Sequence, residues 1–177
     1  GIICPMINSR EDAIRFVSYC RYSPQGTRSY GPGRAMLYAG NDYSMQANET
    51  ILTLAMIETV KALENLEEIL TVEGLDAVFV GPSDLGLSLG YSPGNFDEPV
   101  LLEAIETILK ITKSKGKKAG IYTLTSKYAK QMIKLAGFVP NEEIKIVYTG
   151  LTKGEKLHES LYSKAEQKVE IGEKGFF

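Results

Sequence analysis

The sequence predicts an α/β fold built on a parallel sheet. Short apolar runs alternate with helix-patterned segments along the 177 residues, and this order is typical of parallel α/β proteins. Two of these runs are followed closely by an acid, Glu58 in the first and Asp84 in the second, with a helix-patterned segment between them. A strand–helix–strand unit of this kind crosses over with right-handed chirality, so its two strands lie side by side and parallel.

The first fifty residues predict one strand, one helix and a long loop. Residues 1–7 form a continuous apolar run, as expected of a strand buried on both faces. A helix then begins after an N-cap at Asn8 or Ser9, with Asp12 in a capping-box-like position, and ends near Cys20. Residues 21–49 are rich in glycine, proline and tyrosine, so we expect a loop without regular structure, which would lie over the site if it is functional.

The rest of the chain continues the alternation of strands and helices. β-Branched and aromatic residues mark the strands, and apolar residues at helical spacing mark the helices. The expected strands are 50–57, 77–80, 117–124 and 144–149, and the expected helices are 60–70, one that follows Ser83, 97–114, 126–135 and 153–162.

Composition narrows the class of protein. The net charge of −2 implies no strong nucleic-acid or anionic-membrane partner. No apolar run approaches the roughly 20 residues that a membrane span needs, and the amino end lacks the basic segment of a signal peptide. The two cysteines, Cys4 and Cys20, show neither metal-type spacing nor the density of a disulfide scaffold. We therefore expect a cytoplasmic protein with reduced thiols.

Glu58 and Asp84 are the candidate metal ligands. If their strands are parallel neighbours, both acids emerge at the carboxyl end of the sheet, where chemistry in parallel α/β folds takes place. Two carboxylates there form a hard-oxygen pocket suited to Mg²⁺ or Mn²⁺, with room for water and an oxygen-rich substrate. The alternative is that Glu58 caps the helix that Thr59 begins and Asp84 caps the helix after Ser83.

Arginine is confined to the front of the chain. All five arginines fall within the first 34 residues, so bidentate clamps for carboxylate or phosphate come only from there. In a functional loop, Arg28 or Arg34 would reach toward an anionic substrate or a neighbouring subunit. In the alternative, these arginines pair with nearby acids while the tyrosines pack the loop down.

Three blocks of the sequence resemble the HpcH/HpaI aldolase family, the metal-dependent pyruvate aldolases related to citrate lyase β subunits. They are Met-Ile-Glu-Thr at 56–59, Gly-Leu-Asp-Ala-Val-Phe-Val-Gly-Pro-Ser-Asp-Leu at 74–85, and Arg-Tyr-Ser-Pro-Gln-Gly-Thr-Arg-Ser-Tyr-Gly-Pro-Gly-Arg-Ala at 21–35, which matches that family's Arg-Tyr-Pro-Pro-x-Gly-x-Arg-Gly. The resemblance covers about residues 1–125. It implies a partial (β/α)₈ TIM barrel, the C-terminal half with about four β/α units.

The resemblance also implies an activity, a carbon–carbon lyase of the class II pyruvate (2-oxo acid) aldolase type. Glu58 and Asp84 would bind Mg²⁺ or Mn²⁺, and the ion would hold pyruvate and stabilise its enolate. Small 2-oxo acids and aldehydes are the implied substrates, and a homo-oligomer is the expected assembly. The implied substrate-binding residues are Met56, where many members have glutamine, and Gly81, Pro82 and Ser83, whose backbone would hold the carboxylate.

The family's catalytic histidine and one substrate-binding arginine come from early strands that this sequence does not contain. The only histidine, His158, lies in the tail, and we expect it to be inert. The polypeptide alone is therefore predicted to be a weak aldolase or none, and its catalytic residues are unknown. The competing interpretation is a non-catalytic folded fragment, a self-associating relic of a polysaccharide-cluster gene fusion, whose two open sheet edges invite pairing.

The tail resembles a different family. Residues 127–138 and 143–161 look like the end of a nucleotide-sugar dehydratase of the CapD/FlaA1 type, whose motif is Tyr-Thr-Gly-Leu-Arg-Pro-Gly-Glu-Lys-Leu. Thr152 and Lys153 stand where that motif has Arg-Pro. The arginine that would face a nucleotide diphosphate is therefore missing, which argues against nucleotide binding. We expect a partial aldolase barrel over 1–138 and a foreign β/α tail over 139–177, joined somewhere in 125–138, with the strand 144–149 at the edge of the barrel.

Overall fold

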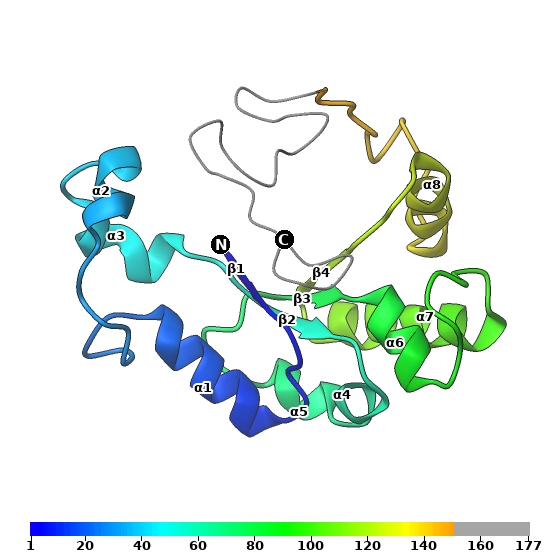
Figure 1. The fold of residues 1–177 in the computed structure, drawn as a ribbon, viewed down its shortest axis with the longest axis horizontal. Helices are drawn as coiled ribbons and strands as arrows, with labels where there is room; N and C mark the ends of the chain where they lie inside the picture. Colours follow the sequence, from blue (N-terminus) through cyan, green and yellow to red (C-terminus); the bar gives the residue numbers. More distant parts are fainter. Residues whose placement is uncertain (151–177) are drawn as a thin grey trace, which may run out of the picture.

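The computed structural model describes residues 1–150 of the chain. Its centre is one parallel sheet in which each strand pairs with the next along the sequence, so the two edges are the first and last strands (Figure 1). The strands are β1 (Ile2–Cys4), β2 (Thr53–Ile57), β3 (Ala77–Val80) and β4 (Lys118–Ile121). The prediction of an α/β fold with a parallel sheet is confirmed.

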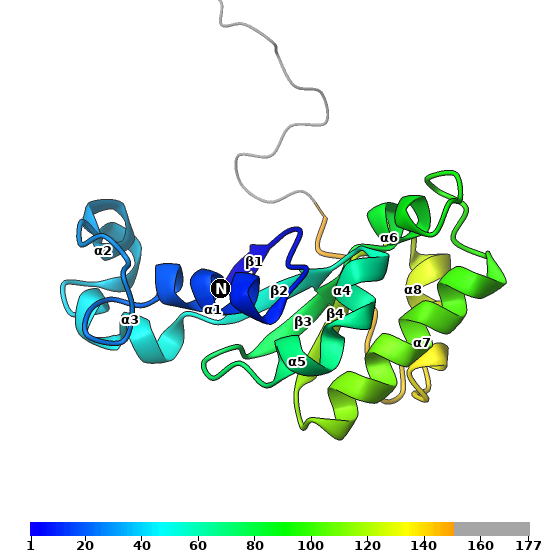
Figure 2. The ribbon, with the colours of Figure 1, turned by 90° about the horizontal axis from the view of Figure 1, so that it is seen from below.

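Helices follow each strand. They are α1 (Arg10–Cys20), α2 (Gly33–Ala39), α3 (Tyr43–Thr50), α4 (Val60–Glu64), α5 (Leu66–Leu70), α6 (Pro82–Ser88), α7 (Pro99–Ser114) and α8 (Ser126–Leu135). Figure 2 shows the sheet from below, with α5 and α7 nearer the viewer. No helix within residues 1–150 combines the length and apolar character needed to cross a membrane.

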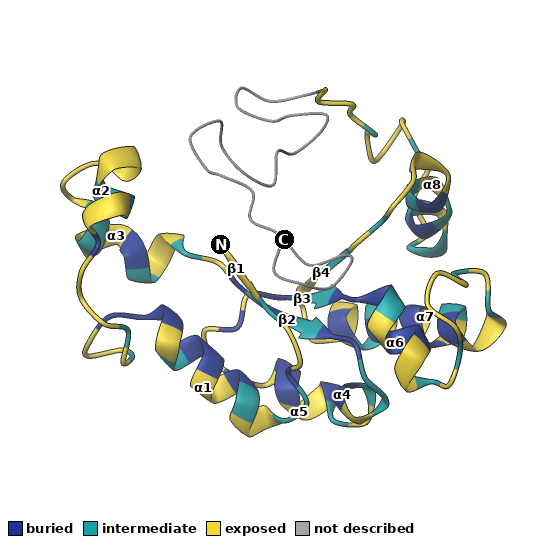
Figure 3. Ribbon diagram, viewed as in Figure 1, coloured by how far each residue is buried: buried dark blue, intermediate teal, exposed yellow. Residues whose placement is uncertain are grey.

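The core lies between one face of the sheet and the helices. The strand residues on that face, Ala55, Ile57, Val78 and Val80, are almost wholly buried against α1, α5 and α7. Figure 3 shows buried residues, in dark blue, on β3 and on these helices. Residues of the opposite face, such as Met56 and its register partner Phe79, are only partly buried. Parallel sheets are usually covered on both faces, whereas residues 1–150 leave this second face partly exposed.

Helix α1 begins as the sequence predicts. The Ser9 hydroxyl accepts a hydrogen bond from the Asp12 amide at 3.1 Å and donates to the Asp12 carboxylate at 2.8 Å. The Asn8 amide also donates to that carboxylate, at 3.2 Å. The hydrogen bond from Ser9, assisted by Arg15, holds the pKa of Asp12 below its ordinary value. These bonds satisfy the amides of Asn8 and Asp12 at the start of α1.

The expectation of an irregular loop over residues 21–49 is wrong for residues 33–49, which contain α2 and most of α3, whereas residues 21–32 form no helix or strand. Two of the segment's glycines mark the ends of α2. Gly33 is the first residue of α2, and Gly40 is its C-cap with a φ of 89°. A positive φ at this position suits glycine, which has no Cβ to clash.

Three further expectations need correction. β1 is not buried on both faces: Ile2 is 48% and Ile3 44% exposed, because β1 is an edge strand beside an open face.

The helix expected over 60–70 breaks at Asn65, whose side chain donates to the Asn8 carbonyl. Residues 144–149 form no strand, and only an isolated bridge joins Pro140 to Ile144. The helix expected at 153–162 and His158 lie outside the described residues.

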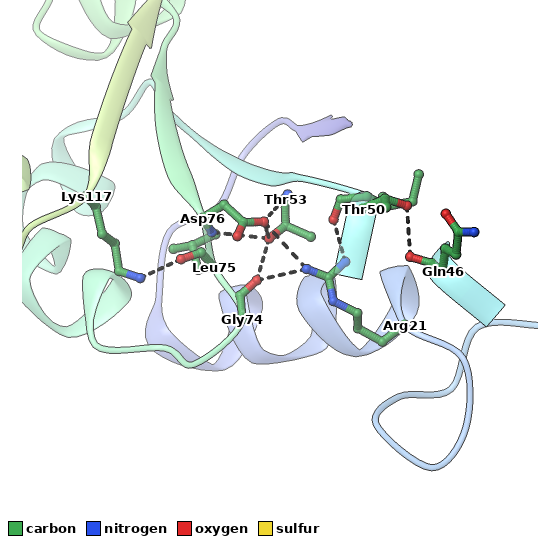
Figure 4. Close-up of polar contacts among 9 residues, drawn as sticks. Arg21, Gln46, Thr50, Thr53, Gly74, Leu75, Asp76 and Lys117 are labelled. Atoms are coloured by element: carbon green, nitrogen blue, oxygen red, sulfur yellow. Dashed lines mark hydrogen bonds and ion pairs between the residues drawn. The ribbon is translucent and has the colours of Figure 1, made fainter. Parts of the chain in front are cut away.

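A polar network fixes the starts of β2 and β3 (Figure 4). One carboxylate oxygen of Asp76 accepts from the Thr53 amide at 2.7 Å and from its hydroxyl at 3.0 Å. The same oxygen lies 3.5 Å from the buried guanidinium of Arg21, which also donates to the carbonyls of Ile51 and Gly74. Three separate stretches of chain therefore meet at this carboxylate.

Asp76→Ala should lower the free energy of unfolding by about 1–3 kcal/mol, because it leaves the Thr53 amide without its acceptor and the buried Arg21 guanidinium without its carboxylate. Urea unfolding followed by circular dichroism measures the change. Glu106→Ala is the matched control, since Glu106 is an exposed acid on α7 with no side-chain hydrogen bond in the described part of the chain. Equal stability of the two variants would contradict a structural role for Asp76.

Candidate metal and substrate site

The candidate site is built from the loops that follow β1, β2 and β3. Since the three strands are parallel, these loops meet at the same edge of the sheet. The register pairs Ile57 of β2 with Val80 of β3, so the next residues, Glu58 and Gly81, emerge side by side. The predicted placement of Glu58 at the carboxyl end of the sheet follows directly from this register.

Glu58 is a buried carboxylate, 4% exposed. Its Oε1 accepts a hydrogen bond from the Met6 amide in the β1 loop at 2.7 Å. Met6 has a φ of 57°, a conformation that residues other than glycine seldom adopt. The hydrogen bond to Glu58 stabilises this backbone conformation, so the loop after β1 and the carboxylate hold each other in place.

Gly81 passes directly beside the Glu58 side chain. A Cβ at position 81 would lie 2.6 Å from Oε2 of Glu58, 3.0 Å from its Cβ and 3.2 Å from the sulfur of Met56. A Cβ atom could not lie 2.6 Å from a carboxylate oxygen, so a larger residue at position 81 would force the Glu58 side chain to move. The second oxygen of Glu58 therefore faces the start of α6, where Asp84 lies.

Asp84 occupies the first turn of α6 and is exposed. Its carboxylate makes no hydrogen bond or ion pair within residues 1–150. The alternative in which the two acids cap helices finds little support. Thr59 caps α4 by accepting from the Ala62 amide, and the N-cap of α6 is Gly81, without a side-chain bond. Asp84 retains only the favourable placement of a negative charge near a helix start.

The backbone after β3 offers few free donors. The Gly81 amide donates to the Ile57 carbonyl at 3.3 Å, and Pro82 has no N–H. The first hydrogen bond of α6 runs from the Leu85 amide to the Gly81 carbonyl at 3.0 Å. The amides of Ser83 and Asp84 precede that ladder, and no backbone carbonyl within residues 1–150 accepts from them. Of the segment 81–83 expected to hold a carboxylate, only Ser83 has an available amide.

The polar residues that join the loops were not singled out from the sequence as site residues. The Asn8 side-chain oxygen accepts from the Thr59 hydroxyl, and its backbone carbonyl accepts from the Asn65 amide group. The Ser88 hydroxyl accepts from the Val60 amide at 2.9 Å. Of these residues, the sequence pointed only to Asn8, because it is a polar residue directly after an apolar strand. It was interpreted as a candidate N-cap of the first helix.

Within this chain, Arg28 and Arg34 are not brought to Glu58. They belong to the segment that leads through α2 and α3 to the start of β2, and Figure 1 shows those helices at the amino end of the strand. The Arg28 guanidinium lies 4.4 Å from the centre of the Tyr22 ring and donates to the Tyr43 hydroxyl at 2.9 Å. Tyrosines therefore pack around Arg28, while Arg34 on α2 is exposed. That Arg28 or Arg34 reaches an anionic substrate or a neighbouring subunit stays a prediction.

As a metal site, the arrangement supplies two carboxylates from adjacent loops. Within residues 1–150 no group of three or more histidine, cysteine or acidic side chains lies close enough to bind an ion. Mg²⁺ in proteins commonly keeps several waters and uses one or two carboxylates together with substrate oxygens. The donor set of Glu58 and Asp84 fits an ion of that kind, and it does not fit a closed structural site such as that of zinc.

Sequence comparison identifies relatives of this chain. It is 44% identical over 137 residues to a hydroxypyruvate/pyruvate aldolase of Rhizorhabdus wittichii, a match that covers 77% of this chain and 54% of the relative. It is 38% identical over 135 residues to a 2-keto-3-deoxy-L-rhamnonate aldolase of Escherichia coli K12, covering 75% of this chain and 50% of the relative. The chain thus spans about half the length of the curated relatives it matches.

Solved structures show the same relationship. A HpcH/HpaI aldolase/citrate lyase family protein from Burkholderia cenocepacia J2315 superposes with a TM-score of 0.68 at 30% identity, covering 77% of this chain and 55% of that one. The HpcH/HpaI aldolase of Desulfitobacterium hafniense DCB-2 gives a TM-score of 0.65 at 28% identity, covering 77% and 53%.

Two family models match the chain. The model described as polysaccharide biosynthesis protein matches residues 104–177, so the carboxyl end is similar to a second family, as expected. The model described as HpcH/HpaI aldolase/citrate lyase matches residues 1–139, more than half of the chain. Together with the aldolases that are 38% and 44% identical in sequence, this match shows that the chain belongs to the HpcH/HpaI aldolase/citrate lyase family.

Proposed function

We propose that the chain carries the metal and substrate site of a carbon–carbon lyase that acts on small 2-oxo acids and aldehydes. The observation that carries this proposal is the buried Glu58 carboxylate, which lies against Gly81 with Asp84 three residues further on. Membership of the family and the aldolase names of its relatives support the reaction class.

Glu58 and Asp84 would hold a divalent cation, Mg²⁺ or Mn²⁺. The structure supports the choice through its donors, which are hard carboxylate oxygens, and through the close packing of Glu58 against Gly81. Once bound, such an ion supplies Lewis-acid stabilisation of the negative charge that develops on a keto oxygen. The Met6 amide keeps Glu58 oriented by bonding one of its oxygens.

The other residues position the substrate. The amides of Ser83 and Asp84 would donate to the carboxylate of a 2-oxo acid, next to the Glu58 carboxylate that fills the space over Gly81. Met56, whose sulfur also borders Gly81, presents an apolar surface where many relatives are expected to have glutamine. We therefore expect a preference for 2-oxo acids that need no hydrogen bond from position 56.

The four β/α units are, in this proposal, the C-terminal half of a (β/α)₈ barrel. Helices cover one face of the sheet, and the structural relatives are matched over about half of their length. The front half would supply the acid–base histidine and the substrate arginine. Residues 139–177 would be a dehydratase-like segment of the CapD/FlaA1 type, and the polysaccharide biosynthesis match over 104–177 supports that assignment.

Calorimetric titration with Mn²⁺ tests the metal site. The chain should bind one ion, and Glu58→Gln and Asp84→Asn should each weaken binding by more than about 10-fold, because changes to groups behind the ligands alone cost roughly 10–100-fold. Glu106→Gln on α7 is the control for loss of one negative charge and should bind normally. Absence of binding by the unchanged chain, or full binding by both site variants, would favour a non-catalytic fragment.

Gly81→Ala should displace Glu58 and weaken Mn²⁺ binding, and overpacking of this kind costs about 1–3 kcal/mol of stability. Gly86→Ala in α6 is a matched control, because a Cβ there would lie 3.7 Å from Leu101, an ordinary contact. Thermal melting and the same titration compare the two. If Gly81→Ala binds Mn²⁺ as well as Gly86→Ala does, the close approach of Gly81 to Glu58 has no role in the site.

The 177-residue chain alone should exchange the methyl protons of pyruvate poorly in the presence of Mg²⁺. General acid–base catalysis is typically worth 10² to 10⁴-fold, so we expect a rate at least ~10²-fold below that of an intact aldolase. Proton NMR in D₂O follows the exchange, with EDTA as the blank. Turnover at the rate of an intact aldolase would show that these residues suffice for catalysis.

A further inference from the structure

Each polar atom of Asn8 makes a hydrogen bond within the described residues. Its backbone amide donates to the Asp12 carboxylate at 3.2 Å, and its carbonyl accepts from the Asn65 side chain at 2.8 Å. Its side-chain oxygen accepts from the Thr59 hydroxyl, and its side-chain nitrogen donates to the Met6 carbonyl at 3.0 Å. Because an amide side chain has an acceptor at one end and donors at the other, these bonds fix Asn8 in one orientation.

The bonds of Asn8 join the loop after β1 to the segment after β2. Met6 and Asn8 belong to the loop, whereas Thr59 and Asn65 belong to the segment that Glu58 begins. The Met6 amide makes a further connection between the two, because it donates to Oε1 of Glu58 at 2.7 Å. Met6 is therefore held at its amide by Glu58 and at its carbonyl by Asn8.

The backbone of Met6 needs this support. Its φ of 57° is a conformation that residues other than glycine seldom adopt, and such conformations persist only when the surrounding structure holds them. Without the bond from Asn8, we expect the loop to relax toward an ordinary conformation and to carry the Met6 amide away from Glu58.

We propose that Asn8 is a positioning residue of the metal site, and that it acts through Met6 to fix which oxygen of Glu58 faces the cation. With Oε1 bonded to the Met6 amide, the other oxygen lies beside Gly81, at the start of the helix that carries Asp84. Asn8 itself would contact neither the ion nor the substrate. This inference rests on the proposed function, since it takes Glu58 as a ligand of the cation.

Calorimetric titration of Asn8→Ala with Mn²⁺ tests the inference. A carboxylate that is already oriented loses less conformational freedom when it binds an ion. Changes to groups that orient metal ligands typically weaken metal binding by about 10–100-fold, so Asn8→Ala should raise the dissociation constant by a factor in that range. The ligands themselves are unchanged in this variant.

Asn48→Ala is the matched control for a general loss of stability. Asn48 on α3 also uses both ends of its side chain, accepting from the Tyr22 amide at 2.7 Å and donating to the Tyr22 carbonyl at 3.1 Å. Helix α3 leads into the amino end of β2, whereas Glu58 follows its carboxyl end. Asn48→Ala should lower the midpoint of urea unfolding and leave the affinity for Mn²⁺ unchanged. An equal loss of affinity in both variants would overturn the proposal.

Thr59 provides a second pair of variants if Asn8→Ala fails to fold. Thr59→Val removes the hydroxyl from which Asn8 accepts, whereas Thr59→Ser keeps it. The same hydroxyl caps α4 by accepting from the Ala62 amide, so urea unfolding is measured for both variants. Thr59→Val should bind Mn²⁺ weakly, and Thr59→Ser should restore binding. Equal affinities of the two would contradict a link through this hydroxyl.

Hydrogen exchange of the Met6 amide tests the same link without any metal. Selective isotope labelling gives one amide signal for each of the five methionines, and Met6→Leu assigns the signal in question. In EDTA, Asn8→Ala should speed exchange of the Met6 amide by about 10-fold, the size expected for loss of one hydrogen bond. The amide of Met132, inside α8, should keep its rate and serves as the internal reference.

The two measurements separate the possible failures. If the unchanged chain binds no Mn²⁺, the proposed function fails and the positioning role of Asn8 falls with it. If the unchanged chain and Asn8→Ala bind Mn²⁺ equally well, the proposed function stands and only the role of Asn8 is wrong. Weaker binding by Asn8→Ala with normal exchange at Met6 would also refute the inference, because the effect would not pass through Met6.

Discussion

The parallel register of β2 against β3 determines the rest of the site. Because Ile57 lies opposite Val80, Glu58 and Gly81 leave the sheet at the same level, and the side chain of one occupies the space that a Cβ on the other would need. A slip of one residue would turn Glu58 to the opposite face of the sheet. The contact of Asp76 with Thr53 fixes the same register at the other end of the two strands. A structural network at the start of the strands thus positions a candidate functional carboxylate at their end.

The elements that the sequence predicted well are those with strong local signals. β3 and α8 have the predicted bounds, because glycine or threonine marks their ends and apolar spacing marks their interior. Ser9 caps α1 as expected, since a serine followed three residues later by an acid satisfies two backbone groups at once. Elements whose limits depend on neighbours in space were predicted less well.

The errors have physical causes that the sequence does not show. The exposure of β1 depends on what lies beside it in the sheet, and an apolar run is the same whether its edge is covered or open. α2 and α3 contain few buried residues, so periodicity gave no signal for them. The strand expected at 144–149 has the right alternation, but the described structure provides no neighbour for it beyond one bridge to Pro140.

For the candidate site, the two acids and Gly81 could be found from the sequence, because each follows an apolar strand. Met6 and Asn8 could not, since their role comes from the packing of one loop against another. The position of Arg28 among tyrosines also depends on helices that the sequence did not reveal. Residue chemistry at strand ends was therefore predictable, and the connections that orient it were visible only in the fold.

The account depends on one cation shared by Glu58 and Asp84. Anomalous diffraction from crystals of the chain grown with Mn²⁺ and pyruvate tests it most directly, because the ion reports its own position. The account predicts a single peak within coordination distance of one carboxylate oxygen from each acid, with pyruvate beside Ser83. A manganese peak held by other residues, or pyruvate bound elsewhere on the chain, would contradict it.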